Sequence, residues 1–283
     1  MSTIAFLGTG LLGAAFVEAA CGRGETVRTW NRTSAKAAAL EAFGATAHAT
    51  PAEAVAGAAR VHLVLKDDDA VESVLAAARA GLGPDAIIVD HSTTLPARTA
   101  ARARRLAAEG VRYLHCPVFI GPAMAREAQG SILVSGPEML YAVVRPALER
   151  QAARVVYLGQ RPDLAAVYKL IGNGFIIGMS GLVADVLSIG AAEGVSAAEA
   201  LKLLDFFNPA GIISGRGQKI AAGDFTPSFE LAMARKDIGL MLETAKDFPL
   251  AVLPGLAARM DALIAAGHGA DDVGIVGKDA VRR

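Results

Sequence analysis

Cysteine is scarce in this chain, which limits how the fold can be stabilised. Only Cys21 and Cys116 are cysteines among 283 residues, and their spacing matches no zinc motif. Two cysteines cannot hold a chain of this length together, so we do not expect a disulfide-rich secreted protein. The five histidines have no metal-ligand spacing either, and we expect no metal site.

The chain also lacks a net charge. Its 28 basic and 28 acidic residues balance, so nothing in the charge predicts a nucleic-acid or membrane partner. No basic region precedes the apolar residues 4–7, which are too few for a signal peptide. We therefore expect a cytoplasmic protein that binds neither nucleic acid nor a membrane.

One long hydrophobic run, residues 167–191, could suggest a membrane span. It contains Lys169, Asn173 and Asp185 as well as several glycines. Polar groups are costly in a lipid-exposed helix, so we interpret the run as a buried helix of a globular protein.

The first 160 residues alternate short β-branched runs with alanine-rich runs. This alternation, with short connections, predicts an α/β domain with a doubly wound parallel sheet covered by helices on both faces. The expected strands are 4–7, 26–30, 61–65, 87–90, 112–115, 132–134 and 155–158. The expected helices are 12–21, 35–43, 52–58, 69–80 and 97–109.

Strand signals nearly vanish after residue 160. Apolar residues then recur at helical spacing, which predicts an all-helical domain over residues 161–283, beginning with a long interdomain helix. The expected helices are 164–192, 197–206, 212–222, 230–248 and 254–266.

A glycine-rich turn follows the first expected strand. Its residues are Gly8, Thr9, Gly10, Leu11, Leu12 and Gly13. In a strand–turn–helix context, the three glycines permit a tight turn, close approach of a pyrophosphate and close helix packing. The free N–H groups of the following helix favour an anion. The turn predicts a Rossmann-type dinucleotide site.

The end of the second strand indicates which dinucleotide binds. A carboxylate there would bind the ribose of NAD, but the residue eighteen positions after Gly13 is Asn31, followed by Arg32 and Thr33. Arg32 can pair with a 2′-phosphate. We expect NADP(H) to be preferred, with NAD(H) as the alternative. If these residues bind no ligand, Arg32 lies on the solvated surface and Thr33 caps the next helix.

Lys169 stands among apolar residues on the expected long helix. Burying an ammonium there is costly unless it is used, and a desolvated lysine has a lowered pKa and can transfer a proton near neutrality. Asn173 lies one turn further on the same helix face. The residues alone equally allow a lysine that extends to the surface beside a structural asparagine.

Together these motifs resemble the β-hydroxyacid dehydrogenase family, which includes 3-hydroxyisobutyrate, glyoxylate/succinic semialdehyde and 6-phosphogluconate enzymes. The resemblance covers essentially the whole chain, with the motifs in the same order and spacing. They are the turn 8–13 and the segments 31–33 (NRT), 90–96 (DHSTTLP), 116–118 (CPV), 169–173 (KLIGN) and 236–237 (KD).

The resemblance implies a role for each matching residue. Lys169 would be the general acid/base on the substrate oxygen, and Asn173 would orient the substrate and the lysine. The cofactor contacts that it implies beyond the glycine turn are Leu65, Lys66, Thr93 and Lys236.

The chain departs from the family at the substrate loop. Members that act on small hydroxy acids commonly have Pro-Val-Ser-Gly there, whereas this chain has Val118, Phe119, Ile120 and Gly121 after Pro117, in a loop about two residues longer. We expect Val118–Gly121 to contact the substrate with Asn173, and the added apolar bulk to favour a larger or less polar substrate.

Other chemical side chains are given structural roles. Asp67, Asp68 and Asp69 are expected to open a helix, and His115 to be a tucked, hydrogen-bonded residue. His91 is expected to support the site without acting in it. The arginines expected on the solvated face of the helix 97–109 are Arg98, Arg102, Arg104 and Arg105.

We conclude that the sequence predicts an NADP(H)-dependent oxidoreductase that interconverts a β-hydroxy acid, or a related alcohol, and its oxo form. The alternatives are an imine reductase-like NADPH enzyme and a non-catalytic NADP-binding protein. The partner is a small carbonyl or alcohol, and the apolar helical half predicts a homodimer or homotetramer.

Overall fold

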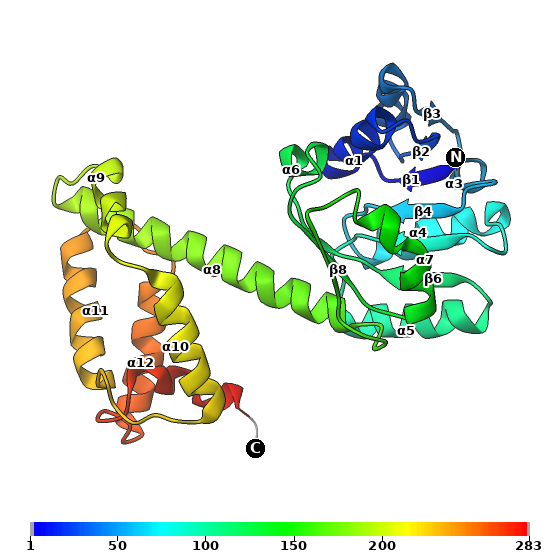
Figure 1. Cartoon of the computed structure of the whole chain (residues 1–283). Helices are drawn as coiled ribbons and strands as arrows, with labels where there is room; N and C mark the ends of the chain where they lie inside the picture. Colours follow the sequence, from blue (N-terminus) through cyan, green and yellow to red (C-terminus); the bar gives the residue numbers. More distant parts are fainter. Residues whose placement is uncertain (1–2, 282–283) are drawn as a thin grey trace. The chain divides into compact units, whose positions relative to one another are not determined.

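The computed structural model describes residues 3–281 and divides into two compact units (Figure 1). They comprise Met1–Asn173 and Gly174–Arg283. The division falls inside helix α8 (Leu164–Ala192), whereas the sequence places a domain boundary at residue 160. The first turns of α8 pack with the first unit, since Ala165 and Ala166 are fully buried there.

A six-stranded parallel sheet forms the centre of the first unit. Its strands are β1 (Ile4–Leu7), β2 (Val27–Trp30), β3 (Thr46–Ala47), β4 (Arg60–Leu63), β5 (Ile87–Asp90) and β6 (Arg112–His115). The strand order is β3-β2-β1-β4-β5-β6. The order reverses between β1 and β4, and ligands of such sheets bind at the carboxyl ends of the strands at this point.

Helices cover both faces of this sheet, as the sequence predicts. They are α1 (Leu11–Gly22), α2 (Ser34–Ala38), α3 (Pro51–Val55), α4 (Asp68–Ala78) and α5 (Pro96–Ala108), with 3₁₀ turns after α2 and α4. Alternate residues of β1 point to opposite faces: Ile4 and Phe6 join one core with Phe16 of α1, whereas Ala5 and Leu7 join the other. The Rossmann-type fold class is confirmed.

A second, three-stranded sheet completes the first unit. It consists of β7 (Val118–Phe119), β8 (Ser131–Val134) and β9 (Arg154–Tyr157), with β7 antiparallel to β8. Helices α6 (Pro122–Arg126) and α7 (Glu138–Leu148) accompany it. The sequence predicts β8 and β9 but not β7, α6 or α7. The two residues of β7 are too few for a strand pattern, the five of α6 are too few for a helical one, and Pro137 and Pro146 obscure α7.

The second unit consists of helices. After α8 come α9 (Ala197–Leu201), α10 (Pro209–Ala222), α11 (Leu231–Ala245) and α12 (Leu253–Ala265), with 3₁₀ helices η3 (Lys202–Asp205) and η4 (Val273–Ala280). Asp185 of α8 is fully buried and accepts hydrogen bonds from the backbone N–H groups of Ala251, Val252 and Leu253 at 2.6–2.9 Å. Burial alone would raise the pKa of Asp185, but these bonds lower it overall. The carboxylate therefore attaches α12 to α8.

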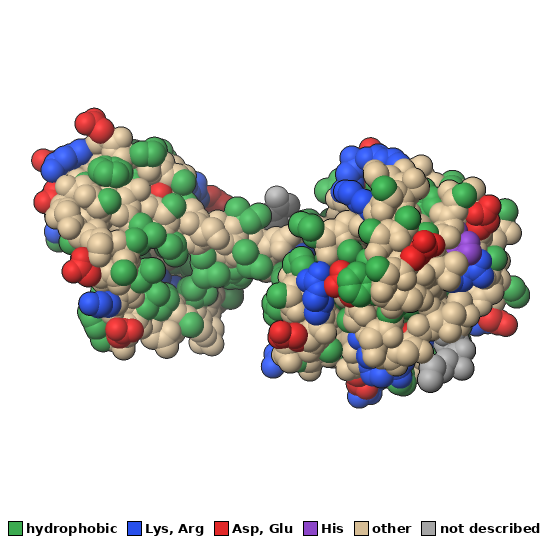
Figure 2. Space-filling model, turned by 90° about the horizontal axis from the view of Figure 1, so that it is seen from above, with side chains coloured by type: hydrophobic (Ala, Val, Ile, Leu, Met, Phe, Trp, Pro, Cys, Tyr) green, Lys and Arg blue, Asp and Glu red, His purple; other side chains and the backbone are tan. Residues whose placement is uncertain are grey.

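The prediction that residues 167–191 form a buried helix is wrong in one respect. The helix is present, but in the single chain only 6% of its most apolar window, of mean hydropathy 1.8, is buried. Phe175, Ile176 and Ile177 are 51%, 51% and 70% exposed, and hydrophobic side chains gather on the surface of this unit (Figure 2). By length and composition, α8 is also apolar enough to cross a membrane. The reason is that α8 is rich in apolar residues along its length, whereas one chain buries few of them, among them Ala165 and Ala166 of its first turns.

Candidate functional site

The glycine turn after β1 is tightly packed. Gly8 has a φ of +98°, and a Cβ on it would lie 2.3 Å from the carbonyl oxygen of Val64. A Cβ on Gly13 would lie 2.1 Å from the carbonyl oxygen of Gly8. Only glycine fits at either position, and the result is that α1 begins directly at the carboxyl end of β1.

Gly10 differs from these two because the space beside it is open. A Cβ on Gly10 would meet nothing within 4 Å. Gly10 is also the N-cap residue of α1, with extended backbone and no side-chain cap. The first N–H groups of α1 are therefore not satisfied by a side chain, and they face a space that a phosphate can enter. These residues fit the pyrophosphate of a dinucleotide.

Asn31 connects this turn to the end of β2. Its Oδ1 accepts a hydrogen bond from the Thr9 N–H at 3.0 Å, and its Nδ2 donates to the Thr33 carbonyl at 3.0 Å. The structure thus places Asn31 beside the predicted cofactor site, where its amide fixes the shape of the turn and uses hydrogen-bonding capacity that a ligand would otherwise take.

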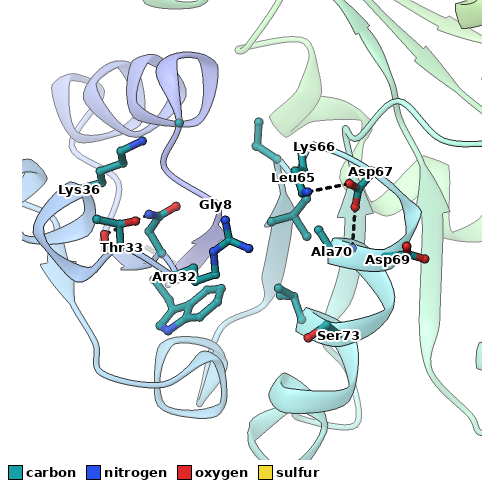
Figure 3. A pocket seen from close by; sticks show the side chains of 15 residues that line it. Gly8, Arg32, Thr33, Lys36, Leu65, Lys66, Asp67, Asp69, Ala70 and Ser73 are labelled. Carbon is teal, nitrogen blue, oxygen red and sulfur yellow. Dashed lines mark hydrogen bonds and ion pairs between the residues drawn. The ribbon is translucent and has the colours of Figure 1, made fainter.

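A first pocket of about 480 Å³ lies at the carboxyl ends of β1, β2 and β4. Arg32, Thr33 and Lys36 extend from one side of it, and Leu65 and Lys66 lie opposite (Figure 3). Thr33 is the N-cap of α2, but its side chain makes no capping hydrogen bond, so its hydroxyl is not engaged in the role that the sequence left open.

Sequence analysis missed several lining residues of this pocket. Lys36 adds a second cation four residues after Arg32, on the first turn of α2, and that spacing was a readable signal. The other missed residues are Trp30, Val64, Asp67, Asp69, Ala70, Ser73 and Val74; Trp30 ends β2, Val64 follows β4, and the rest lie on α4 or directly before it.

The acidic residues of the first pocket are already paired. Asp67 caps α4 by accepting the Ala70 N–H at 2.8 Å, as the sequence predicts, and pairs with Lys66 at 3.0 Å. The backbone bond and then Lys66 lower the pKa of Asp67. Asp69 pairs with Arg98 at 2.7 Å. Within the described part of the first unit, Arg32 and Lys36 form no ion pair, so they remain available for an anion.

A second pocket, of about 400 Å³, continues along the same edge of the sheet. It shares Gly10, Leu65 and Lys66 with the first pocket. The predicted residues that it adds are Leu11, Leu12, Gly13, Thr93, Val118, Ile120 and Lys169, and it also adds His91. The two pockets therefore bring most predicted cofactor residues and the predicted catalytic lysine to one groove.

Lys169 lies half-buried beside an aromatic ring. Its Nζ is 4.2 Å from the centroid of the Phe119 ring. Burial lowers its pKa from 10.5. Its ammonium forms no ion pair with any carboxylate of residues 3–173. The lysine is therefore held in a position where it can bind an anion or pass a proton.

The remaining predicted residues lie elsewhere. Phe119 packs on α8, since a Cβ on Gly172 would lie 2.2 Å from its Cζ. Phe119, Gly121 and Asn173 are not among the residues that line the second pocket of the described first unit. Lys236 belongs to the second unit, on α11, where it pairs with Asp237 at 2.9 Å.

His91 lines the second pocket but is committed to a structural network. Its Nδ1 is 2.7 Å from the Cys116 carbonyl oxygen, and its Nε2 is 3.0 Å from His62 Nδ1. Burial lowers the pKa of both histidines. A neutral His91 that donates to Cys116 must accept from His62, so it has no proton to exchange with a substrate. His115 is buried as predicted, but neither of its nitrogens has a hydrogen-bond partner among the described residues.

Comparison with known proteins agrees with this geometry. The model of the NAD-binding domain of 6-phosphogluconate dehydrogenase matches residues 3–159. The chain is 27% identical to the 3-sulfolactaldehyde reductase of Escherichia coli K12, covering 96% of this chain and 93% of that protein. It is 29% identical to glyoxylate/succinic semialdehyde reductase 1 of Arabidopsis thaliana, covering 88% of each.

Among solved structures, the imine reductase of Streptomyces aurantiacus is 30% identical, with a TM-score of 0.87 over 99% of this chain and 100% of that one. The matched NAD-binding domain covers more than half of the chain, and this match identifies the family. The chain belongs to the β-hydroxyacid dehydrogenase family of NAD(P)-dependent oxidoreductases.

Proposed function

We propose that the groove binds NADP(H) in preference to NAD(H). Arg32, Lys36 and the hydroxyl of Thr33 lie on one side of the first pocket, where they suit the 2′-phosphate. The open N-terminus of α1 at Gly10 suits the pyrophosphate. The second pocket, with Thr93 and Lys66, then receives the nicotinamide half.

We further propose that Lys169 is the general acid/base. A bound nicotinamide coenzyme supplies or accepts the hydride. The chain itself must hold the substrate and handle one proton. In reduction, the Lys169 ammonium donates a hydrogen bond to the carbonyl oxygen and releases a proton to it as the alcohol forms. The observation that carries this proposal is the presence of Lys169 in the same pocket as Gly10 and Thr93.

The charges of the second pocket favour an anionic substrate. Its lining contains Lys169 and Lys66, of which Lys66 pairs with Asp67, but no acidic residue in the described first unit. A carbonyl compound that bears a carboxylate or sulfonate is attracted there, and one relative is named for a sulfonated aldehyde. Val118 and Ile120 add apolar surface, which favours a chain longer than that of glyoxylate.

The second candidate is an imine reductase. It is favoured by the likeness to the Streptomyces aurantiacus enzyme over the whole chain. Lys169 opposes it, because an ammonium in the second pocket repels an iminium cation. A non-catalytic dinucleotide-binding protein would have no need of an unpaired, half-buried lysine in this pocket.

We also propose a cytoplasmic homodimer or homotetramer. The exposed apolar surface of α8 is larger than a monomer normally leaves uncovered, and a second copy of the same chain would cover it. Asp185 supports this, because its buried bonds to α12 make α8 part of a folded helical unit.

The first prediction concerns the coenzyme. Arg32→Ala should weaken NADPH binding by about one to two orders of magnitude, the effect of one charged hydrogen bond, and leave NADH binding nearly unchanged. Lys36→Met should act in the same direction. Titration calorimetry with both coenzymes measures this, with Arg112→Ala as the control, since Arg112 pairs with the exposed Asp85. Equal binding of NADPH and NADH by the wild-type protein would contradict the proposal.

The second prediction concerns Lys169. Lys169→Met should slow hydride transfer by about 10²–10⁴-fold, the usual contribution of a positioned acid or base, with little change in NADPH binding. Because burial lowers the pKa of Lys169, the wild-type rate of reduction should fall as pH rises through a value below 10.5, and the rate of oxidation should rise.

Lys169→Arg is the matched control, since arginine keeps the charge but does not release its proton. It should retain substrate binding, lose turnover and abolish this pH dependence. Stopped-flow single turnovers measure the rates. A Lys169→Met protein that transfers hydride at a near-normal rate would show that Lys169 is not the acid.

The third prediction concerns the substrate. In a panel with NADPH, aldehydes with a carboxylate or sulfonate and a chain longer than glyoxylate should have the highest kcat/KM. Phe119→Ser should raise kcat/KM for glyoxylate, because loss of the ring opens space beside Lys169 and the serine adds a hydroxyl. Faster reduction of cyclic imines than of every carbonyl would instead favour the imine reductase, and no turnover at all would favour the non-catalytic protein.

The fourth prediction concerns assembly. Light scattering should give two or four times the chain mass of 29.0 kDa. Ile177→Glu on α8 should shift the protein toward monomers because it places a charge in the covered surface. Val143→Glu is a matched control, since Val143 is 68% exposed, close to the 70% of Ile177, but lies on α7. A wild-type monomer would refute the proposal.

A further inference from the structure

Arg102 of α5 is a buried cation. The sequence analysis assigned it to the solvated face of the helix, which is wrong: its side chain is 0% exposed, whereas that of Arg105, one turn further on, is 47% exposed. Burying a guanidinium costs several kcal/mol unless charges and hydrogen bonds compensate it. The pattern of the helix alone does not reveal this burial, because the compensating groups lie on other elements.

Three carboxylates surround the Arg102 guanidinium. Its Nη2 donates to Asp68 Oδ1 at 2.7 Å, and its Nε donates to Glu72 Oε1 at 2.7 Å. Its Nη1 lies 3.7 Å from Asp90 Oδ2. Burial alone would lower the pKa of Arg102, but Tyr113, Asp90 and Asp68 raise it overall. Arg102 is therefore charged at every pH at which the protein is folded.

Tyr113 completes this arrangement. Burial and Asp90 raise its pKa, so its hydroxyl stays protonated and donates to Asp90 Oδ2 at 2.7 Å. Asp90 Oδ2 is thereby held between Tyr113 and Arg102, and Asp68 Oδ1 is held by Arg102. Each of these two carboxylates has its second oxygen available for another group.

Both second oxygens bind the backbone of one loop. Asp68 Oδ2 accepts the Leu95 N–H at 2.9 Å, and Asp90 Oδ1 accepts the Ser92 N–H at 2.9 Å. Thr93 lies between these two attachment points. Ser92 Oγ in turn accepts the Leu65 N–H at 3.1 Å, so the loop that carries Lys66 is attached to the same network.

We propose that Arg102 is a positioning residue for hydride transfer, which acts through Asp68 and Asp90 to fix the two loops that carry Thr93 and Leu65–Lys66 along the second pocket. The inference rests on the proposed function of that pocket. Arg102 itself does not line the pocket in the described structure. A buried ionic network stabilises no better than apolar residues of the same volume; what it adds here is a fixed direction for each carboxylate, and therefore for each loop N–H group.

The test separates the two halves of the coenzyme. Arg102→Lys keeps the charge but loses the forked geometry, and Asp68→Asn keeps an oxygen for the Leu95 N–H but loses the ion pair. Asp68→Asn also serves if Arg102 variants fold poorly. Arg105→Met is the matched control on α5, because Arg105 pairs with the same Glu72 from the exposed side. The readouts are single-turnover hydride transfer, the binding of NADPH and of 2′-phospho-ADP-ribose, and amide exchange by mass spectrometry.

Arg102→Lys and Asp68→Asn should slow hydride transfer by about 10–100-fold, as expected for a misplacement on the order of 1 Å. They should weaken the binding of NADPH more than that of 2′-phospho-ADP-ribose, because Thr93 lines only the second pocket, whereas Leu65 and Lys66 line both. Amide exchange should accelerate at residues 64–66 and 92–95 but not at residues 8–13. Arg105→Met should change none of these. Equal loss of both coenzyme ligands, or unchanged transfer with unchanged exchange, would overturn the proposal.

Failure of the proposed function gives a different result. If the wild-type protein transfers hydride to no carbonyl compound, the assigned reaction is wrong. The comparison of NADPH with 2′-phospho-ADP-ribose still decides the role of Arg102, because a positioning residue of the second pocket must weaken the binding of NADPH more than that of the shorter ligand. No difference between the two ligands would then overturn it.

Discussion

The close approach of α1 to the ends of β1 and β4 is the constraint on which the groove depends. Gly8 and Gly13 have no room for a side chain, and the clashing atoms would be backbone oxygens that cannot move aside. Any larger residue would push α1 away from the sheet. Because α1 is held there, its uncapped N-terminus opens at the point where the strand order reverses. Both pockets share Gly10 at that point, so the two pockets meet at the N-terminus of α1.

The walls of the two pockets are held by polar side chains that bind backbone groups rather than a ligand. Asn31 uses its amide to fix the turn and the start of α2, and Asp90 and Asp68 fix the loop after β5. Among the described residues of the first unit, Arg32 at one end and Lys169 at the other form no ion pair. Walls held by backbone hydrogen bonds reduce the entropy lost when an anion binds, which suits the dinucleotide and the substrate proposed for this groove.

Local patterns allowed much of this to be predicted. The strand β1, the glycine turn and the start of α1 are contiguous in sequence, so their joint role was readable. Lys169 stood out as an ammonium in an apolar helix, but only the family resemblance implied a catalytic role for it. Arg102 was misassigned for the opposite reason: on an arginine-rich helix nothing distinguishes the one residue that three distant carboxylates enclose. Burial of α8 was also misjudged, because a sequence shows that a surface is apolar but not whether the same chain covers it.

Phe119 shows how a departure from the family pattern is accommodated. Its ring occupies the place that a Cβ on Gly172 would need, so the bulk at residue 119 and the absence of bulk at residue 172 belong together. The same ring lies 4.2 Å from Lys169 Nζ, where its face stabilises the ammonium while its body excludes water. Burial lowers the pKa of Lys169. Phe119 thus contacts both Lys169 and Gly172, so a substitution at residue 119 changes the surroundings of the lysine together with the space beside α8.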